Sequence, residues 1–166
     1  MSDFRVRKRH RLRQKELEHL SGQIDDLLGT RSFSQDDVVD MAEAPEFNVI
    51  FVNGKILAFT PSGRPFLTVR GLLQFGASKR YVTVDMGAVK FVYNGADVMG
   101  PGIVAVDPLI AEDDLVWVRD ERNRQPLAIG RAMMNADAIS RKEKGKAVQS
   151  IHHVGDKLWL YEEPEE

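Results

Sequence analysis

The sequence predicts an α+β protein with a helix and a β-hairpin in its first half and a small β-barrel in its second half. Apolar residues recur at helical spacing between Gln14 and Leu28, which indicates one amphipathic helix. Two β-rich runs between Asn48 and Phe59 flank an Asn-Gly dipeptide, which is typical of a hairpin turn. After residue 80, short apolar runs alternate with polar turns at the spacing expected for a small barrel.

The predicted helix Gln14–Leu28 has one apolar face and a clear end. Gly29 follows it and can adopt the left-handed backbone conformation that commonly ends a helix. Acidic residues lie off the apolar stripe, so the stripe should pack in a core while the rest of the helix faces solvent. The stripe consists of Leu17, Leu20, Ile24, Leu27 and Leu28.

The rest of the first half contains one further helix and one ambiguous segment. Asn53 and Gly54 tolerate positive φ at both turn positions and therefore predict a two-residue hairpin. Residues 34–44 are ambiguous, because their first serine can cap a helix whereas their adjacent valines suit a strand. Val69–Phe75 is predicted as a short helix, and the polar, unpatterned residues 77–80 mark a domain boundary.

The second half is predicted to consist mostly of strands separated by polar turns. A final strand is expected at Leu158–Tyr161. The other predicted strands are Tyr81–Val84, Ile103–Val106, Leu115–Arg119, Leu127–Met133 and Gln149–Val154.

The composition excludes several classes of protein. The 166 residues suffice for one ordinary domain or two small ones, and a hydrophobic fraction of 43% supports a packed core. The absence of cysteine excludes disulfides, thiolate zinc sites and cysteine nucleophiles. No apolar run approaches the roughly 20 residues that span a bilayer, and the basic N-terminus lacks the apolar segment of a secretory signal. We therefore expect a soluble, cytoplasmic protein without a membrane partner.

Charge is unevenly distributed, although the net charge is only -2. Four glutamates lie near the end of the chain, and cations crowd its start. The basic cluster favours a polyanion partner, but a solvated arm is the alternative interpretation, and the sequence leaves both open. The clustered cations are Arg5, Arg7, Lys8, Arg9, Arg11, Arg13 and Lys15.

The segment Val82–Val104 combines a strand, a short helix and a glycine-rich turn. Asp85 can cap a helix that starts two or three residues later, and Gly95 can end it. The turn Met99–Ile103 contains two glycines, which expose backbone amides to another molecule. With Lys90 nearby, this surface suits a sugar-phosphate backbone, whereas the alternative is a turn that needs glycine only for its own dihedral angles.

This segment resembles the opening of a PUA domain, the module named for pseudouridine synthases and archaeosine transglycosylases. The resemblance rests first on residues 84–103, with the sequence VDMGAVKFVYNGADVMGPGI. It extends over about Lys79 to Tyr161. The further matching pieces are Pro126–Ala132, Gly145–Val148 and Ile151–Trp159.

The start of the chain, from Val6 to Leu17, resembles the N-terminal domain of archaeal PUA proteins, which are similar to the eukaryotic malignant T-cell-amplified sequence proteins of translation. The resemblance implies a small N-terminal α/β domain at 1–78, a PUA-type β-barrel at 79–161 and an acidic tail at 162–166. It further implies a non-enzymatic RNA-binding protein whose partner is tRNA or small-subunit ribosomal RNA. Two alternatives stay open: an adaptor for a translation factor whose PUA domain is mainly structural, and an accessory subunit of an RNA-modifying enzyme.

In PUA domains the short helix, the glycine loop and the following strand form the RNA surface. Gly100 stands where many archaeal relatives carry Arg, and Asp113-Asp114 stands where Gly-Asp is usual. Because Gly100 precedes a proline and should have dihedral angles that any residue can adopt, we expect Gly100→Arg to be tolerated and to tighten RNA binding. The resemblance assigns RNA binding to Met86, Gly87, Ala88, Lys90, Phe91, Gly95, Met99, Pro101, Gly102 and Ile103.

The sequence predicts no catalytic, metal or cofactor site. His152 and His153 are adjacent, so a strand would place them on opposite faces. The first half is too short for the catalytic domain of a pseudouridine synthase. Both tryptophans, Trp117 and Trp159, are predicted to pack in a core or at its rim rather than to stack on bases. A solvated loop is predicted to hold Arg119, Arg122 and Arg124.

Overall fold

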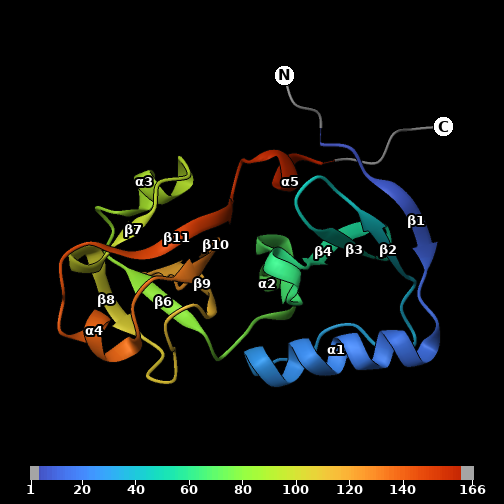
Figure 1. Cartoon of the computed structure of the whole chain (residues 1–166), viewed down its shortest axis with the longest axis horizontal. Coiled ribbons are helices and arrows are strands. Elements are labelled where there is room, and N and C mark those ends of the chain that lie inside the picture. Colours follow the sequence, from blue (N-terminus) through green and yellow to red (C-terminus); the bar gives the residue numbers. More distant parts are fainter. Residues whose placement is uncertain (1–3, 162–166) are drawn as a thin grey trace. The chain divides into compact units, whose positions relative to one another are not determined.

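The computed structural model describes residues 4–161, which form two compact units (Figure 1). Of the described residues, the first unit contains 4–77 together with Leu160 and Tyr161, and the second contains Ser78–Trp159. Each unit has its own sheet and its own buried apolar residues. Every helix within residues 4–161 is too short or too polar to span a bilayer.

The first unit is built on an antiparallel sheet with two helices. Its strands run in the order β1-β2-β3-β4-β5, so β1 and β5 form the edges. A short 3-10 turn, Pro61–Gly63, connects the last two strands. The elements are β1 Arg7–Arg11, α1 Gln14–Leu28, β2 Val39–Glu43, β3 Asn48–Val52, β4 Lys55–Phe59, β5 Phe66–Leu67 and α2 Val69–Phe75.

The predicted helices and hairpin of this unit are confirmed. Helix α1 has the predicted bounds, and Gly29 ends it at φ 62° with its amide donating to the Asp25 carbonyl at 2.9 Å. Asn53 and Gly54 have φ values of 51° and 88° between β3 and β4, as a two-residue hairpin requires. Helix α2 has the predicted bounds too.

The ambiguous residues 34–44 form a turn followed by strand β2. The Ser34 amide donates to the Asp37 carboxylate at 2.9 Å, so the serine belongs to a turn and not to a helix start. Strand β2 then pairs with β1 on one side and β3 on the other. This pairing decides between helix and strand, which local propensity left open.

The second unit is a nearly closed barrel in the strand order β7-β11-β10-β9-β6-β8. Strands β6 and β9 are parallel, and the other paired strands are antiparallel. The predicted α+β class with a C-terminal barrel is therefore confirmed. The elements are β6 Tyr81–Val84, α3 Val89–Tyr93, β7 Val98–Met99, β8 Ile103–Val106, β9 Leu115–Asp120, β10 Pro126–Ala132, α4 Ala136–Ser140 and β11 Lys146–His153.

The predicted final strand at Leu158–Tyr161 is wrong, because Lys157–Leu160 form the short helix α5. The Asp156 carboxylate accepts hydrogen bonds from the Trp159 amide at 2.8 Å and from the His153 amide at 3.0 Å. These bonds turn the chain after β11 and cap the first turn of α5. Gly155, at φ 90°, supplies the left-handed residue in that turn.

Candidate nucleic-acid interface

The short helix predicted to begin two or three residues after Asp85 begins at Val89, four residues after it. Asp85 accepts a hydrogen bond from the Ala88 amide at 2.9 Å, and this bond shapes a turn that leads into α3 at Val89. The Asp85 amide donates to the Gly102 carbonyl at 3.0 Å. One residue thus ties the start of the helix to the glycine loop, so both belong to one rigid surface.

The residues assigned to RNA binding differ in exposure. Ala88, Gly95 and Gly102 are half-buried, and the side chain of Ile103 is only 3% exposed, so Ile103 can offer only its backbone to a ligand. The Lys90 ammonium lies 5.1 Å from the ring centroid of Phe91, which is 55% exposed. We call the exposed members the α3 surface: Met86, Gly87, Lys90, Phe91, Met99 and Pro101.

Gly95 is required by the fold itself. It ends α3 with φ 84°, and its amide donates to the Val92 carbonyl at 3.0 Å. A Cβ atom at this position would lie 2.8 Å from Nε2 of His153. Both the left-handed backbone and the close histidine therefore demand glycine, whether or not RNA approaches it.

The expectation that Gly100→Arg is tolerated is wrong. Its backbone conformation is ordinary, but the residue is buried, and its amide donates to the Gly145 carbonyl at 2.9 Å. A Cβ atom would collide with the carbonyl oxygen of Glu143. The loop before β11 therefore fills the space that a side chain at position 100 would need.

That loop and the first residue of β11, together called the loop of residues 141–146, bring cations to the glycine loop that sequence analysis missed. The Lys142 ammonium donates to the Ile103 carbonyl at 3.3 Å. Arg141 is paired with Asp137 and Glu143, and Lys146 with Asp97, whereas Lys144 is exposed. The signal in the sequence was the run Arg-Lys-Glu-Lys-Gly-Lys. The sequence alone does not relate this run to the site, because only the packing of the loop on Gly100 brings the two together.

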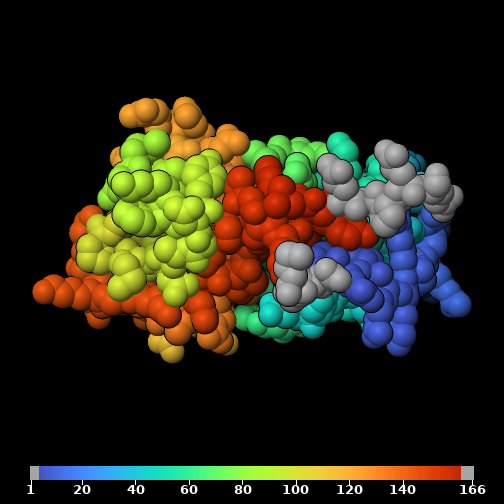
Figure 2. All heavy atoms as spheres, turned by 90° about the horizontal axis from the view of Figure 1, so that it is seen from above, coloured from blue at the N-terminus to red at the C-terminus, as the bar shows by residue number. Residues whose placement is uncertain are grey.

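A second loop lies at the other side of the α3 surface. The Met86 amide donates to the Glu121 carboxylate at 2.8 Å, so the exposed Arg122 and Arg124 of the β9–β10 turn are near neighbours of this segment. Figure 2 shows the yellow-green α3 region between the orange turn and the orange-red loop of residues 141–146. The α3 surface therefore lies between two loops that carry basic residues, and the side chain that contacts it from the β9–β10 turn is the carboxylate of Glu121.

Arg119, which was predicted to lie in the same solvated loop as Arg122 and Arg124, lies instead within strand β9. Arg119 is half-buried, its guanidinium stacks 3.9 Å from the centroid of the Tyr81 ring, and its Nε donates to the Thr83 hydroxyl at 2.9 Å. Trp117 is buried, and its indole N–H donates to the Lys79 carbonyl at 2.7 Å, which confirms the predicted core packing.

The structure also shows what Asp113-Asp114 do in place of the Gly-Asp pair that is usual in PUA domains. Asp113 has φ 79°, a conformation that favours glycine, which accounts for the glycine expected at this position. Asp114 pairs with Arg80 at 2.6 Å and accepts from the Ala111 amide at 2.8 Å. The departure changes the turn before β9 and lies outside the α3 surface.

The two adjacent histidines have separate partners. His152 is buried with Nδ1 2.9 Å from the Asp156 carboxylate, whereas Nδ1 of His153 is 2.9 Å from the Val154 carbonyl. Burial alone would raise the pKa of Asp156, but hydrogen bonds from His152 and from two backbone amides outweigh it and lower the pKa. Within residues 4–161, no three histidine or carboxylate side chains are grouped to hold a metal ion.

Comparison with known proteins identifies the second unit. Residues 80–154 match the PUA domain family. An uncharacterised protein of Methanocaldococcus jannaschii is 38% identical over 148 residues, which cover 89% of this chain and 88% of that protein. The solved structure of a hypothetical protein from Pyrococcus horikoshii is 35% identical, with a TM-score of 0.79, and the match covers 92% of this chain and 98% of that one.

Eukaryotic relatives match as well. Malignant T-cell-amplified sequence 1 of Danio rerio is 31% identical over 140 residues, covering 82% of this chain and 77% of that protein. Translation machinery-associated protein 20 of Eremothecium gossypii is 33% identical over 116 residues, covering 66% of this chain and 64%, less than two thirds, of that protein. The chain therefore belongs to the family of PUA-domain proteins that includes the malignant T-cell-amplified sequence proteins and translation machinery-associated protein 20.

Proposed function

We propose that this protein binds structured RNA through the α3 surface and acts in translation, in the cytoplasm, without catalysis of its own. The RNA is tRNA or ribosomal RNA of the small subunit. The observation that carries the proposal is the rigid junction of α3 and the glycine loop, where Lys90 and Phe91 are exposed together between two basic loops. The names of the eukaryotic relatives support a role in translation.

The chemistry of this surface suits an RNA backbone better than a specific base sequence. Lys90 and Lys144 can each contact a phosphate as a point charge, while Phe91 offers an exposed ring face for an unpaired base. The half-buried glycines let the nucleic-acid backbone approach closely. Recognition would therefore depend on phosphate position and RNA shape, with limited readout of base edges.

The test is the substitution Lys90→Glu in the full chain, titrated with a labelled tRNA transcript at several salt concentrations. We expect affinity to fall about tenfold, because one phosphate contact is replaced by a repulsive charge. The wild-type log–log salt slope should be near -3, from roughly four contacts at about -0.7 each, and the variant should lose about 0.7 of it.

A matched control is Lys55→Glu, which makes the same charge change on the exposed hairpin of the other unit. Both variants should melt within a few degrees of the wild type, because exposed substitutions change stability by less than about 0.5 kcal/mol. Equal affinities for the wild type and a folded Lys90→Glu variant would contradict an RNA contact at α3.

A further inference from the structure

The first unit carries a strongly basic strand at the edge of its sheet. All five residues of β1 are exposed, with the sequence Arg-Lys-Arg-His-Arg. Among the described strands β1 pairs with β2 alone, so its other edge faces away from the sheet. We call six exposed cations on and next to this strand the β1 surface: Arg5, Arg7, Lys8, Arg9, Arg11 and Arg13.

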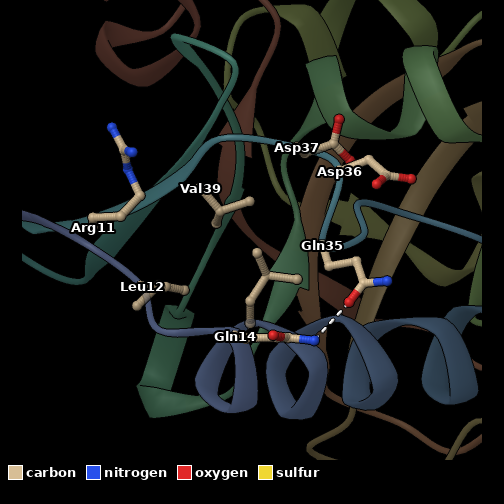
Figure 3. A pocket seen from close by; sticks show the side chains of 8 residues that line it. Arg11, Leu12, Gln14, Gln35, Asp36, Asp37 and Val39 are labelled. Atoms are coloured by element: carbon tan, nitrogen blue, oxygen red, sulfur yellow. Dashed lines mark hydrogen bonds between the residues drawn. The ribbon is translucent and has the colours of Figure 1, made fainter.

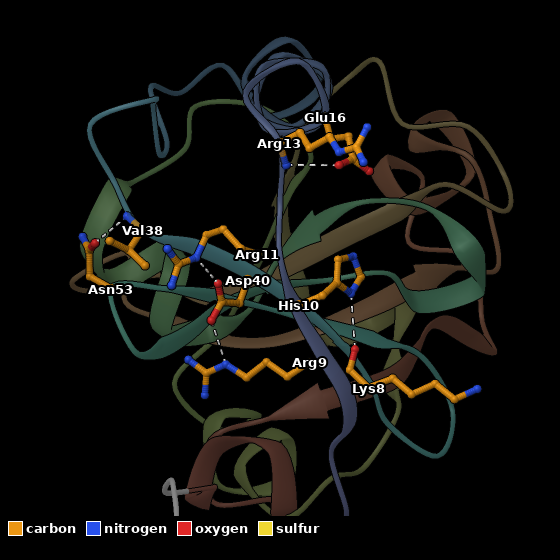
Figure 4. Close-up of polar contacts among 9 residues, drawn as sticks. All are labelled: Lys8, Arg9, His10, Arg11, Arg13, Glu16, Val38, Asp40 and Asn53. Atoms are coloured by element: carbon orange, nitrogen blue, oxygen red, sulfur yellow. Dashed lines mark hydrogen bonds and ion pairs between the residues drawn. The ribbon is translucent and has the colours of Figure 1, made fainter.

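Asp40 holds two of these arginines in fixed positions (Figure 4). Its carboxylate accepts from Nε of Arg9 at 2.9 Å and from Nε of Arg11 at 2.5 Å. Burial alone would raise the pKa of Asp40, but the hydrogen bonds from Arg11 and Arg9 outweigh it and keep the pKa below its ordinary value. The carboxylate therefore stays charged, and the side chains of Arg9 and Arg11 remain 35% and 63% exposed around it.

The nearby carboxylates do not neutralise the β1 surface. Asp40 and Glu43 pair with three of the six cations, Glu16 accepts from the backbone amide of Arg13, and two further aspartates lie beside Arg11 at the far end of the strand. The Lys8 ammonium is 3.8 Å from Glu43, yet its side chain is 72% exposed. Arg5 and Arg7 line a hollow of about 360 Å³ together with Glu43. At the Arg5–Lys8 end of the strand three cations face the carboxylate of Glu43, so positive charge is in excess there, although the net charge of the chain is -2.

The geometry of β1 disfavours the addition of a protein strand at this edge. Lys8 has φ 56°, and the pairing with β2 shifts register between Arg7 and His10, which marks a β-bulge. Bulges and charged side chains are the usual devices that prevent a sheet edge from pairing with another chain. The described residues 4–13 also contain no large, fully exposed apolar side chain of the kind that anchors protein interfaces.

The adjacent hollow at the end of β1 is not suited to an anion. Its volume is about 300 Å³, and Arg11 lines it together with Gln14, Gln35, Asp36 and Asp37 (Figure 3). The two aspartates would repel a phosphate near Arg11. The phosphate-binding part of the β1 surface therefore lies toward Arg7 and Lys8.

We propose that the β1 surface binds the phosphodiester backbone of RNA as a contact region additional to the α3 surface. The inference rests on the proposed function, since it extends RNA binding to the first unit. Five of the six cations are arginine, whose planar fork of donors matches phosphate oxygens. Alternate residues of a strand are about 7 Å apart, which is comparable to the spacing of successive phosphates along a nucleic-acid strand.

The test compares Arg7→Gln/Lys8→Gln with Arg31→Gln/Lys55→Gln in the full chain. Both pairs remove two exposed cations from the first unit, but Arg31 follows the far end of α1, about 20 Å along the helix, and Lys55 lies three strands from β1. With a labelled tRNA transcript, the β1 pair should weaken binding five- to tenfold at low salt and reduce the salt slope by about 1.4. The control pair should bind within about twofold of the wild type.

Lys90→Glu, titrated in parallel, separates this inference from the proposed function. Loss of affinity in Lys90→Glu with a wild-type slope in the β1 pair would overturn the β1 contact and leave the α3 site standing. The reverse pattern would overturn the α3 site and keep the β1 contact. If poly-L-glutamate displaces the tRNA from the wild type as effectively as unlabelled tRNA of equal charge does, but displaces it less effectively from the β1 pair, the β1 surface binds acidic protein, and the inference fails.

Discussion

Gly100→Arg should destabilise the PUA unit by about 3 kcal/mol and weaken RNA binding. The new Cβ atom would collide with the Glu143 carbonyl oxygen, and the bond from the Gly100 amide to the Gly145 carbonyl would be lost as the chain moved. Because the displaced loop carries Lys142 and Lys144, the added arginine would also disturb the cations already present. Thermal unfolding and the same tRNA titration measure the two effects.

The control for this experiment is Gly102→Ala in the same turn. A Cβ atom at Gly102 would meet the Ala88 Cβ at 3.7 Å, which is ordinary van der Waals contact. We therefore expect its melting temperature to stay close to that of the wild type. A Gly100→Ala variant as stable as Gly102→Ala would show that the loop of residues 141–146 does not pack on Gly100.

Asp156→Ala should cost about 3 kcal/mol of stability at neutral pH. The substitution removes the acceptor of the amides of His153 and Trp159 and the partner of the buried His152 side chain. Buried hydrogen-bond donors that have no acceptor destabilise the folded state. The short helix α5 should unwind, because Asp156 caps it and the helix has only four residues.

The loss of stability caused by Asp156→Ala should be largest near neutral pH and smaller in acid. The folded state lowers the pKa of Asp156, so the stabilisation is complete above the ordinary aspartate pKa and is lost as pH falls through the lower, folded value. The stability difference between wild type and Asp156→Ala should be constant near neutral pH and narrow below about pH 4. Denaturant unfolding at several pH values checks this, with Asp137→Ala on the exposed end of α4 as control. A difference that grows on acidification would contradict the assigned charge state.

Local patterns predicted the elements whose signals lie within a few residues. Helix α1 followed from its leucine spacing, and the β3–β4 hairpin followed from Asn53 and Gly54, because these residues determine their own backbone angles. The barrel followed from the spacing of its strands and from resemblance to the PUA domain. In each case the neighbouring sequence and the final packing favour the same conformation.

The predictions that proved wrong depended mostly on contacts between segments that are distant in the sequence. Reasoning from dihedral angles at Gly100 ignored the loop at 141–146, more than 40 residues later, which occupies the space around it. The apolar run after Asp156 suited a strand, but the carboxylate of that aspartate starts a helix instead. Arg119 was assigned to a solvated loop because its stacking on Tyr81 requires the pairing of β6 with β9.

The central claim, that RNA binds at the α3 surface, is tested most directly by photochemical crosslinking of the wild-type protein to bound tRNA. Mass spectrometry of the digested complex identifies the peptides that carry nucleotides. We expect crosslinks in the segment 86–103, with Phe91 as the main aromatic acceptor, and in the loop of residues 141–146. Crosslinks absent from both segments, in a complex that still binds tRNA, would contradict the account.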